Sequence, residues 1–438
     1  MNIRHDKKEN GHITPFRWPQ FDEEQISDVV AVLRSGKVNS WTGNKVHEFE
    51  EAYATLLGRR HAIALANGSV ALELALRAIG LLPGDEVIVT PRSFIASASC
   101  VPMAGGVPIF ADVDIESQAI TAESIAAVMT PRTRAVIVVH LAGWPADMDS
   151  ILSLAAERGI IVIEDCAQAH GAEYKGRPVG SFGHIAVFSF CQDKIISTGG
   201  EGGLLVLDDD TIWARAWSFK EHGKAHELLS SKTHPVGFRW LCETFGTNYR
   251  MTEVEAAIGL RQLQRLPAWH AQRSANAAIL LDAFRGLPGL RTPQPPAHVR
   301  HAWYRLYTFV RPEKLKRGWN RDRILDAVTA ASVECFTGSC PEIYREKAFS
   351  DFQPARRLVA AKLLGETSLA FLVDPCQDAA SMLRVAQVVA AVMHDATEAT
   401  TEIERPAEAP DRWVPWAGVK SHAIDNVGLV GGQAGRAN

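Results

Sequence analysis

Five short apolar runs rich in valine and isoleucine alternate with helical stretches in the first half of this 438-residue chain. The runs are HAIALAN (61–67), EVIVT (86–90), VPIF (107–110), RAVIVVH (134–140) and GIIVIED (159–165). Helical spacing of apolar residues separates them, at Ser69–Ile79, Phe94–Ala104, Ala122–Met129 and Met148–Arg158. Because strands that alternate with helices pair through crossover connections, the sequence predicts an α/β fold with a mostly parallel sheet. In such folds ligands bind at the carboxyl ends of the strands.

The rest of the chain extends this pattern at both ends. Amphipathic helices are expected from Asp22 to Arg34 and from Val46 to Leu57. After Gly203 come a strand, GLLVL, a helix near 210–221 and a long helix over 252–284, which Pro267 should kink or break.

A Pro-rich connector, RTPQPPAH (291–298), precedes a second α/β pattern. This pattern comprises a strand in AWYRLYTFV (302–310), a helix from Asp322, a helix over 354–364, the strand SLAFLV and a helix over 379–394. We therefore expect an N-terminal arm (1–20), a large domain (21–290), a smaller C-terminal domain (291–395) and a flexible tail (396–438).

Charge and composition exclude several classes of protein. The formal net charge of −4 gives no reason to expect nucleic acid or an acidic membrane as a partner. The polar start, MNIRHDKKEN, lacks the apolar core of a signal peptide, and no run approaches the roughly 20 apolar residues that span a bilayer, so a cytoplasmic location is expected. The seven cysteines contain no CxxC and the histidines no HExxH, so no metal is predicted.

Three features lie at expected strand ends. The first is NGSVALELAL from Asn67, where a strand turns through Gly68 and Ser69 into a helix. Free backbone N–H groups, a helix dipole and a hydroxyl make such a turn a natural phosphate site. Serine is also a good N-cap, so a purely structural role is the alternative.

The second feature is VIEDCAQAHGA, in which Asp165 ends the most apolar strand. A buried carboxylate is costly unless it meets a cation or hydrogen-bond donors, and a protonated pyridine nitrogen is one such cation. The alternative is that Asp165 caps a helix that begins near Ala167.

The third feature is SFCQDKIISTGGEGG, which places Lys194 between Ser189 and four glycines. A lysine is usually a solvated surface residue. Together, however, an anion site, a buried carboxylate and a lysine at one edge of a sheet meet the requirements of pyridoxal phosphate: a phosphate anchor, a partner for the ring nitrogen and a Schiff-base lysine.

The chain resembles the DegT/DnrJ/EryC1/StrS family of sugar aminotransferases over roughly Pro19 to His394. The resemblance lies in SGKVNSWTG, NGSVALELAL, PGDEVIVTP, GVPIFADVD, VHLAGWPADM, EDCAQAHGAEYKGRPVGSFG, FSFCQDKIISTGGEGG and GTNYRMTEVEAAIGLRQL. It implies pyridoxal-phosphate fold type I, in which helices flank a mostly parallel seven-stranded sheet and a smaller C-terminal α/β domain follows. It also implies a homodimer with shared active sites.

The resemblance further implies roles for individual residues. Lys194 would bind the cofactor as a Schiff base, Asp165 would pair with the pyridine nitrogen, and Gln168 would hydrogen-bond the ring 3-hydroxyl. The phosphate would be bound by Gly68, Ser69 and Ser189, with Asn248 reaching in from the neighbouring subunit. Phe94 would stack on the ring, although TPRSFIASAS departs from the commoner P-[SA]-[YF]-T-F pattern.

The leading hypothesis is an aminotransferase that moves an amino group from glutamate onto a keto group of a nucleotide sugar. A keto-cyclitol aminotransferase that uses glutamine is an alternative. A dehydratase of this family has histidine in place of the lysine, so Lys194 argues against it. A non-enzymatic regulatory protein would have no need of Lys194, Asp165, Gln168 and Ser189 together.

Overall fold

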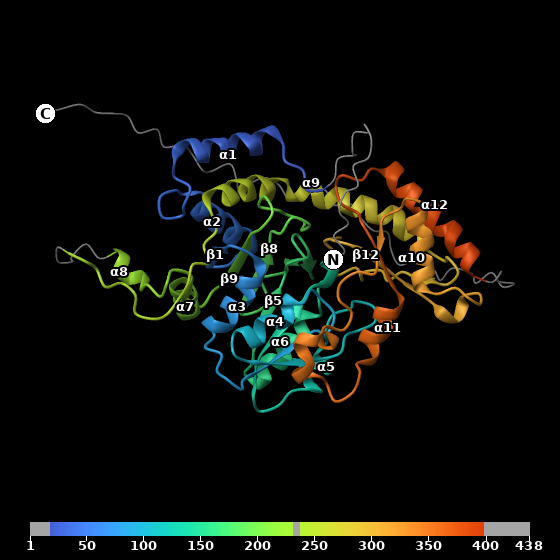
Figure 1. Ribbon diagram of the computed structural model, residues 1–438, viewed down its shortest axis with the longest axis horizontal. Coiled ribbons are helices and arrows are strands. Elements are labelled where there is room, and N and C mark those ends of the chain that lie inside the picture. The colour runs from blue at the N-terminus through green and yellow to red at the C-terminus, as the bar shows by residue number, and fades with distance from the viewer. Residues whose placement is uncertain (1–17, 231–236, 398–438) are drawn as a thin grey trace. The chain divides into compact units, whose positions relative to one another are not determined.

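The computed structural model describes residues 18–230 and 237–397, and these form a layered α/β structure (Figure 1). The chain divides into two compact units, Met1–Ile403 and Glu404–Asn438, and all described residues belong to the first. Most of the predicted arm and nearly all of the predicted tail lie outside the described residues. None of the helices in the described part is long and apolar enough to cross a membrane.

Seven strands form the central sheet, in the order β1-β9-β8-β5-β4-β2-β3. Their bounds are β1 His61–Leu65, β2 Glu86–Val89, β3 Val107–Phe110, β4 Thr133–Val139, β5 Ile161–Asp165, β8 Ile185–Ser189 and β9 Gly203–Leu207. Neighbouring strands are parallel except that β9 runs antiparallel to both β1 and β8. The prediction of a mostly parallel seven-stranded sheet is therefore confirmed.

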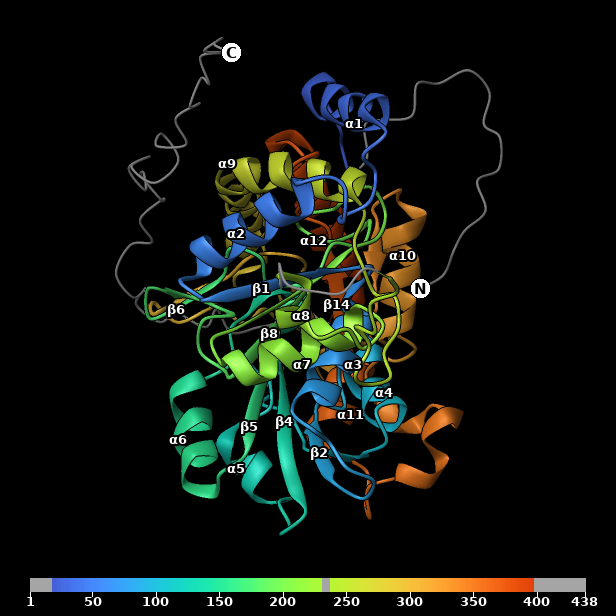
Figure 2. The same cartoon turned by 90° about the vertical axis from the view of Figure 1, so that its left-hand side faces the viewer.

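Helices cover both faces of this sheet, which explains why its strands are apolar on both sides. Along β9, Leu204 and Val206 pack in a cluster with α2 (Lys45–Leu57) and the long helix α9 (Glu253–Phe284). The alternate residues Leu205 and Leu207 pack in the cluster that includes α3 (Gly68–Ala78). Figure 2 shows α1 (Glu23–Ser35) outside α9, with which it makes contact.

The remaining elements of the large sheet region connect or cover its strands. They are α4 Ala96–Met103, α5 Ala122–Ala126, α6 Met148–Arg158, α7 Asp210–Lys220 and α8 His226–Ser230, with the short strands β6 Glu173–Tyr174, β7 Arg177–Pro178 and β11 Val299–Arg300 in a sheet of their own.

Of the two predicted effects of Pro267, a kink or a break in the long helix, the break is wrong, because α9 continues through the proline. Proline costs about 3 kcal/mol in a helix interior. Packing along the whole length of the helix outweighs this cost, since α9 contacts α1, α2 and α12 (Ala379–Ala396). Leu266 and His270, on either side of the proline, are both buried.

A second, antiparallel sheet follows α9, in the order β10-β12-β14-β13. Its strands are β10 Leu290–Arg291, β12 Leu306–Val310, β13 Cys335–Phe336 and β14 Ser368–Phe371, and its helices are α10 Arg321–Ala330, α11 Val359–Thr367 and α12. The predicted start of α11 at residue 354 is wrong. The helix begins later because Asp112, far away in the sequence, accepts hydrogen bonds from the first-turn amides of Ala360 and Ala361 at 2.9 and 3.0 Å.

Candidate active site

Four strand ends meet at one edge of the central sheet. Leu65 at the end of β1 and Ser189 at the end of β8 both pair with Gly203, the first residue of β9. On the next strand, Asp165 pairs with Val187 of β8. The register therefore brings the ends of β1, β8 and β5 together, and the turns that follow them carry Gly68, Ser69, Gln168 and Lys194.

The predicted phosphate site is a close junction between α3 and β8. A Cβ atom on Gly68 would lie 2.7 Å from the Cβ of Ser189, so only glycine allows this approach. Asn67 is the N-cap of α3, because its side chain accepts a hydrogen bond from the backbone of Val70 at 3.0 Å. The alternative role for Ser69 is therefore not needed, and its exposed hydroxyl lies at the first turn of α3.

Asp165 is buried and has hydrogen-bond donors on both carboxylate oxygens. Ser97 Oγ on α4 donates at 2.7 Å and the backbone N–H of Ala167 at 3.1 Å. Turns, not a helix, follow Asp165, so it does not cap a helix near Ala167. Burial raises the pKa of this carboxyl above its ordinary value even though these donors and Lys194 oppose the shift. The site therefore favours an additional cation beside Asp165.

Gln168 is also buried, and its side chain is fixed from one end. Its Oε1 accepts a hydrogen bond from the backbone N–H of Ala142 at 2.8 Å. Ala142 has φ 58°, a left-handed conformation that turns this amide toward the glutamine. The amide nitrogen of Gln168 is thereby kept in a defined orientation.

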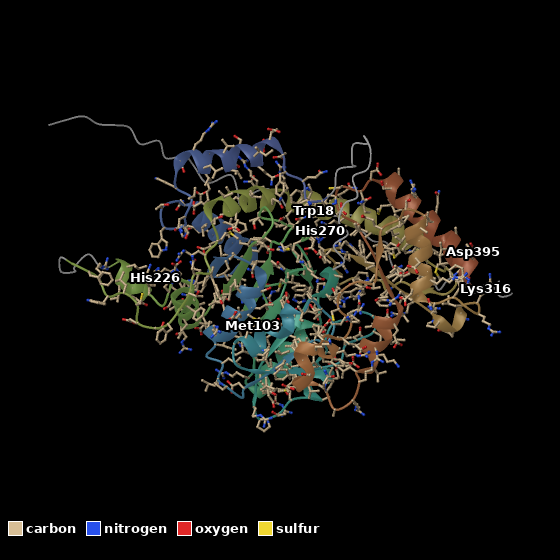
Figure 3. The ribbon with its side chains drawn as sticks, viewed as in Figure 1. Trp18, Met103, His226, His270, Lys316 and Asp395 are labelled. Carbon is tan, nitrogen blue, oxygen red and sulfur yellow. The ribbon has the colours of Figure 1, made fainter. Side chains whose placement is uncertain are left out.

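Lys194 is held at its backbone and at its amine. Trp18 Nε1 donates to its carbonyl oxygen at 2.7 Å, and its Nζ lies 2.9 Å from Asp193 Oδ1. Trp18 packs edge-on against Trp269 of α9 with ring centroids 4.8 Å apart, near His270, which is labelled with it in Figure 3. The lysine is thus tied to α9 as well as to the sheet.

Two predicted site residues lie at the surface of the described chain. Phe94 is 57% exposed, which leaves its ring available for stacking. Asn248 is exposed, and its side chain accepts a hydrogen bond from the backbone of Arg250 at 3.2 Å. The carbonyl of the next residue, Tyr249, accepts a hydrogen bond from the N–H of Ala66 at 2.9 Å. The segment that contains Asn248 therefore runs beside the end of β1 that leads to Gly68.

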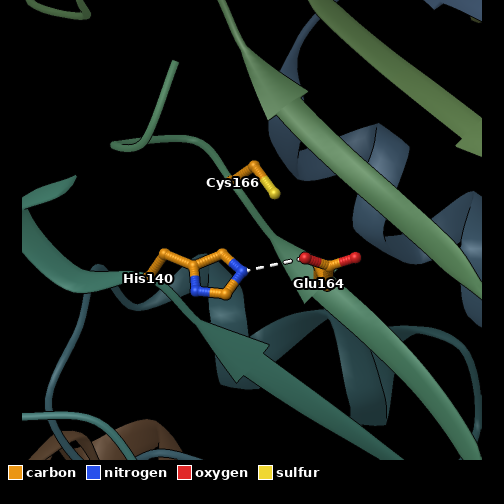
Figure 4. A group of neighbouring side chains, drawn as sticks. All are labelled: His140, Glu164 and Cys166. Atoms are coloured by element: carbon orange, nitrogen blue, oxygen red, sulfur yellow. Dashed lines mark hydrogen bonds and ion pairs between the residues drawn. The ribbon is translucent and has the colours of Figure 1, made fainter. Parts of the chain in front are cut away.

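A second buried polar cluster lies behind the site, composed of His140, Glu164 and Cys166 (Figure 4). One ligand-type atom from each lies within 4.8 Å of the others, which would suit a metal. However, His140 Nδ1 accepts from the backbone of Ala146 at 3.1 Å, so Nε2 carries the proton that it donates to Glu164 at 3.0 Å. Burial raises the pKa of the Cys166 thiol, which opposes the thiolate form that metals bind. The absence of a metal stays a prediction.

Four residues that shape the site were not predicted from the sequence: Trp18, Ser97, Asp193 and Tyr304. Asp193 directly precedes Lys194, so its closeness was visible in the sequence. Trp18 and Tyr304 contact the Lys194 segment from positions 176 residues and 111 residues away, and no local pattern marks such contacts.

Comparison with known proteins agrees with the fold. Residues 19–392 match the profile of the DegT/DnrJ/EryC1/StrS aminotransferase family. A solved aminotransferase from Psychrobacter cryohalolentis is 46% identical, with a TM-score of 0.85 over 87% of this chain and 100% of that chain.

Two relatives of known sequence carry more specific names. The spore coat polysaccharide biosynthesis protein SpsC of Bacillus subtilis is 36% identical over 73% of this chain and 81% of its own length. The "Putative L-glutamine:3-amino-2,3-dideoxy-scyllo-inosose aminotransferase" of Streptoalloteichus tenebrarius is 36% identical over 76% of this chain and 79% of its own length.

Proposed function

Because the chain belongs to the DegT/DnrJ/EryC1/StrS aminotransferase family, we propose that it transfers an amino group from glutamate to the keto group of a nucleotide-activated sugar. The aminotransferases of this family depend on pyridoxal phosphate and act on small molecules, and their fold is the one found here. The nucleotide on the sugar and the choice of glutamate are part of the proposal.

The observation that carries the proposal is the register of the sheet edge. Pairing through Gly203 and Val187 brings the strand ends at Leu65, Ser189 and Asp165 side by side. A phosphate site, a carboxylate and a lysine therefore converge on one region, as pyridoxal phosphate requires.

The residues at this edge fit the cofactor. Asp165 is a buried carboxyl whose pKa is raised by burial, so a protonated ring nitrogen would supply the cation that the site favours. Gly68 allows the N-terminus of α3 to approach Ser189, which leaves backbone N–H groups and two hydroxyls for a phosphate. When bound, pyridoxal phosphate supplies a ring that accepts electrons from the carbon that bears the amino group.

The chain's own residues then have separate tasks. Lys194 would hold the cofactor through its Nζ, and the same amine, when free, would move a proton. Asp165 would keep the ring nitrogen protonated, and Gln168 would orient the ring through its fixed amide. The exposed ring of Phe94 would be available to stack on the cofactor ring.

The name of the Bacillus subtilis relative supports a role in polysaccharide biosynthesis. The name of the Streptoalloteichus tenebrarius relative supports a second candidate, the transfer of an amino group from glutamine to a keto-cyclitol. Both reactions use the same cofactor chemistry and differ in donor and acceptor.

A two-by-two substrate assay separates these candidates. The purified protein, loaded with pyridoxal phosphate, is given glutamate or glutamine and then a set of keto-sugar nucleotides or keto-cyclitols. We expect glutamate to bleach the visible cofactor absorbance and a keto-sugar nucleotide to restore it. Recovery only with glutamine and a keto-cyclitol would establish the second candidate, and no bleaching by any amino donor would refute both.

We also propose that the protein is a homodimer in which Asn248 binds the cofactor phosphate of the partner subunit. The segment that precedes Asn248 in the sequence exposes three large aromatic side chains: Phe238, Trp240 and Phe245 are 79%, 85% and 99% exposed. Exposed aromatic residues gathered on one segment are typical of protein interfaces.

Mixing two inactive variants tests the shared site. In a heterodimer of Lys194→Ala and Asn248→Ala chains, one site would carry both changes and the other neither, so up to about half of normal activity should return. If Asn248 serves its own chain, every site keeps one change and no activity returns. Subunit exchange is verified by mass spectrometry, so absence of any gain would refute the shared site.

A further inference from the structure

Asp193 and Tyr304 surround the amine of Lys194 and have no role in the proposed function so far. Asp193 Oδ1 lies 2.9 Å from Lys194 Nζ, and its Oδ2 accepts a hydrogen bond from the hydroxyl of Tyr304. The same amine lies 5.2 Å from the centroid of the Tyr304 ring. Tyr304 comes from the segment just before β12, so the two ends of this cluster are far apart in the sequence.

We propose that Asp193 and Tyr304 form a seat that holds the ε-amino group of Lys194 whenever this lysine is not linked to the cofactor, and that stabilises this group once it has accepted a proton. The inference rests on the proposed role of Lys194. Asp193 is a positioning residue in this scheme, because it acts through the lysine and not on the substrate.

The geometry of the seat fixes the carboxylate as well as the amine. Tyr304 is buried, and its hydroxyl holds one oxygen of Asp193, so the other oxygen stays directed at Lys194. The guanidinium of Arg305 lies 4.7 Å from the centroid of the Tyr304 ring and adds positive charge near Asp193. The Tyr304 ring thus contacts two cations, both within 5.2 Å of its centroid.

The electrostatics agree with this geometry. Burial alone would raise the pKa of Asp193, but Lys194 and the hydrogen bond from Tyr304 hold it below its ordinary value. Burial would lower the pKa of Lys194, but Tyr304 and Asp193 hold it above its ordinary value. Other titratable or charged groups also face this cluster, and they are the same in every variant proposed below: Cys191, Glu201, Asp165, His170, Arg273 and Arg305.

The seat has a consequence for the proton that Lys194 moves. When the incoming amine displaces the lysine, the freed Nζ is neutral and can take a proton from the substrate carbon. The resulting ammonium is stabilised by Asp193, which stays ionised and takes no proton itself. Lys194 would then give this proton to a second carbon, different from the one that lost it, so it would be a base and an acid in turn at one fixed place.

The test measures the ionisation of Lys194 in the full-length, cofactor-free chain. Brief acetylation with acetic anhydride at a series of pH values, read by mass spectrometry of the Lys194 peptide, gives the pH of half-maximal reactivity, with the exposed Lys37 as reference. In the wild type the Lys194 midpoint should lie above that of Lys37. Asp193→Asn should lower the Lys194 midpoint by about 1 to 3 pH units, since an opposite charge at this distance has an effect of that size.

Two further variants make the result specific. Asp193→Glu keeps the charge and should restore at least part of the shift. Asp149→Asn makes the same chemical change in the exposed pair of Asp149 and Lys175, with N–O distance 2.5 Å, and should leave the Lys194 midpoint unchanged.

Failure of this inference differs from failure of the proposed function. If a wild-type Lys194 midpoint falls at or below that of Lys37, or if Asp193→Asn leaves it unchanged, the seat is wrong. The wild-type measurement decides this even if a variant does not fold. If pyridoxal phosphate gives no visible absorbance and borohydride fixes no cofactor on Lys194, the proposed function is wrong whatever the acetylation shows.

Discussion

Glu164 and Asp165 are adjacent on β5, point to opposite faces of the sheet and are both buried, yet their surroundings differ. Glu164 accepts hydrogen bonds from His140 and from three backbone N–H groups, those of Gly180, Phe182 and Gly183, at 2.6 to 3.0 Å. Asp165 accepts two, from Ser97 and Ala167.

The pKa values of the two carboxyls move in opposite directions. Burial would raise both, but the hydrogen bonds to Glu164 reverse the effect and hold its pKa below the ordinary value. At Asp165 burial prevails and the pKa is raised. A buried acid whose donors are sufficient to keep its pKa low is structural, whereas one whose pKa stays raised still favours a cation and is suited to a ligand.

The largest effect is expected from Lys194→Ala. This change removes the amine that the proposed function needs to hold the cofactor beside Asp165. Turnover and the covalent attachment of cofactor should both be lost, since no other amine in the described site is placed to replace Nζ. The thermal unfolding midpoint of the cofactor-free protein should change little. Visible absorbance and a transamination assay report the loss, and turnover close to that of the wild type would contradict the mechanism.

Asp165→Asn should lower the turnover rate about 100-fold or more, the size of effect expected when a preorganised charge is removed. The amide keeps the shape but cannot stabilise a protonated ring nitrogen by charge. Because the folded protein raises the pKa of Asp165, the ionised carboxylate costs stability near neutral pH. The cofactor-free variant should therefore unfold at the same temperature as the wild type or higher. A large loss of stability with little loss of activity would make Asp165 structural.

Glu164→Gln should show the reverse of Asp165→Asn, a loss of stability. The free energy of unfolding should fall by about 3 kcal/mol, because the donors around Glu164 are arranged for a buried negative charge that the amide does not carry. The folded-state pKa of Glu164 is depressed, so its contribution is fully present above the unfolded value of about 4.3 and disappears as the pH falls through the folded value. The difference between wild type and variant should thus be largest near neutral pH and shrink in acid. Denaturant titrations across this range measure it, and a difference independent of pH would show that the charge of Glu164 has no part.

The sequence predicts the central sheet because short runs of valine and isoleucine between helical stretches are typical of buried strands. It could not predict that β9 inserts between β1 and β8, since the order of strands depends on long-range packing. It also could not exclude a break at Pro267, where packing of α9 on three helices outweighs the local preference of proline. Local rules fail where contacts distant in sequence decide.

The same division holds for the site. Strand ends pointed to Asp165, Ser189 and Gly68, and the register now places them together. The seat formed by Asp193 and Tyr304 could not be predicted, because Tyr304 reaches it from another part of the chain. Asn248 remains a prediction, since its proposed contact is with a second chain.

The smallest effect is expected from Cys166→Ala, which tests whether the cluster of His140, Glu164 and Cys166 is held by hydrogen bonds alone. Cys166 is fully buried, and its thiol lies near Glu164 and His140. If the thiol only fills space, its removal should cost about 1 kcal/mol in the free energy of unfolding and leave cofactor binding unchanged. If the three residues instead bind a metal, the purified wild type should contain it in stoichiometric amount and Cys166→Ala should lose both the metal and several times more stability. Elemental analysis together with thermal unfolding of both proteins distinguishes these outcomes. A chelator gives an independent control, because it should leave the unfolding temperature of a protein held by hydrogen bonds unchanged.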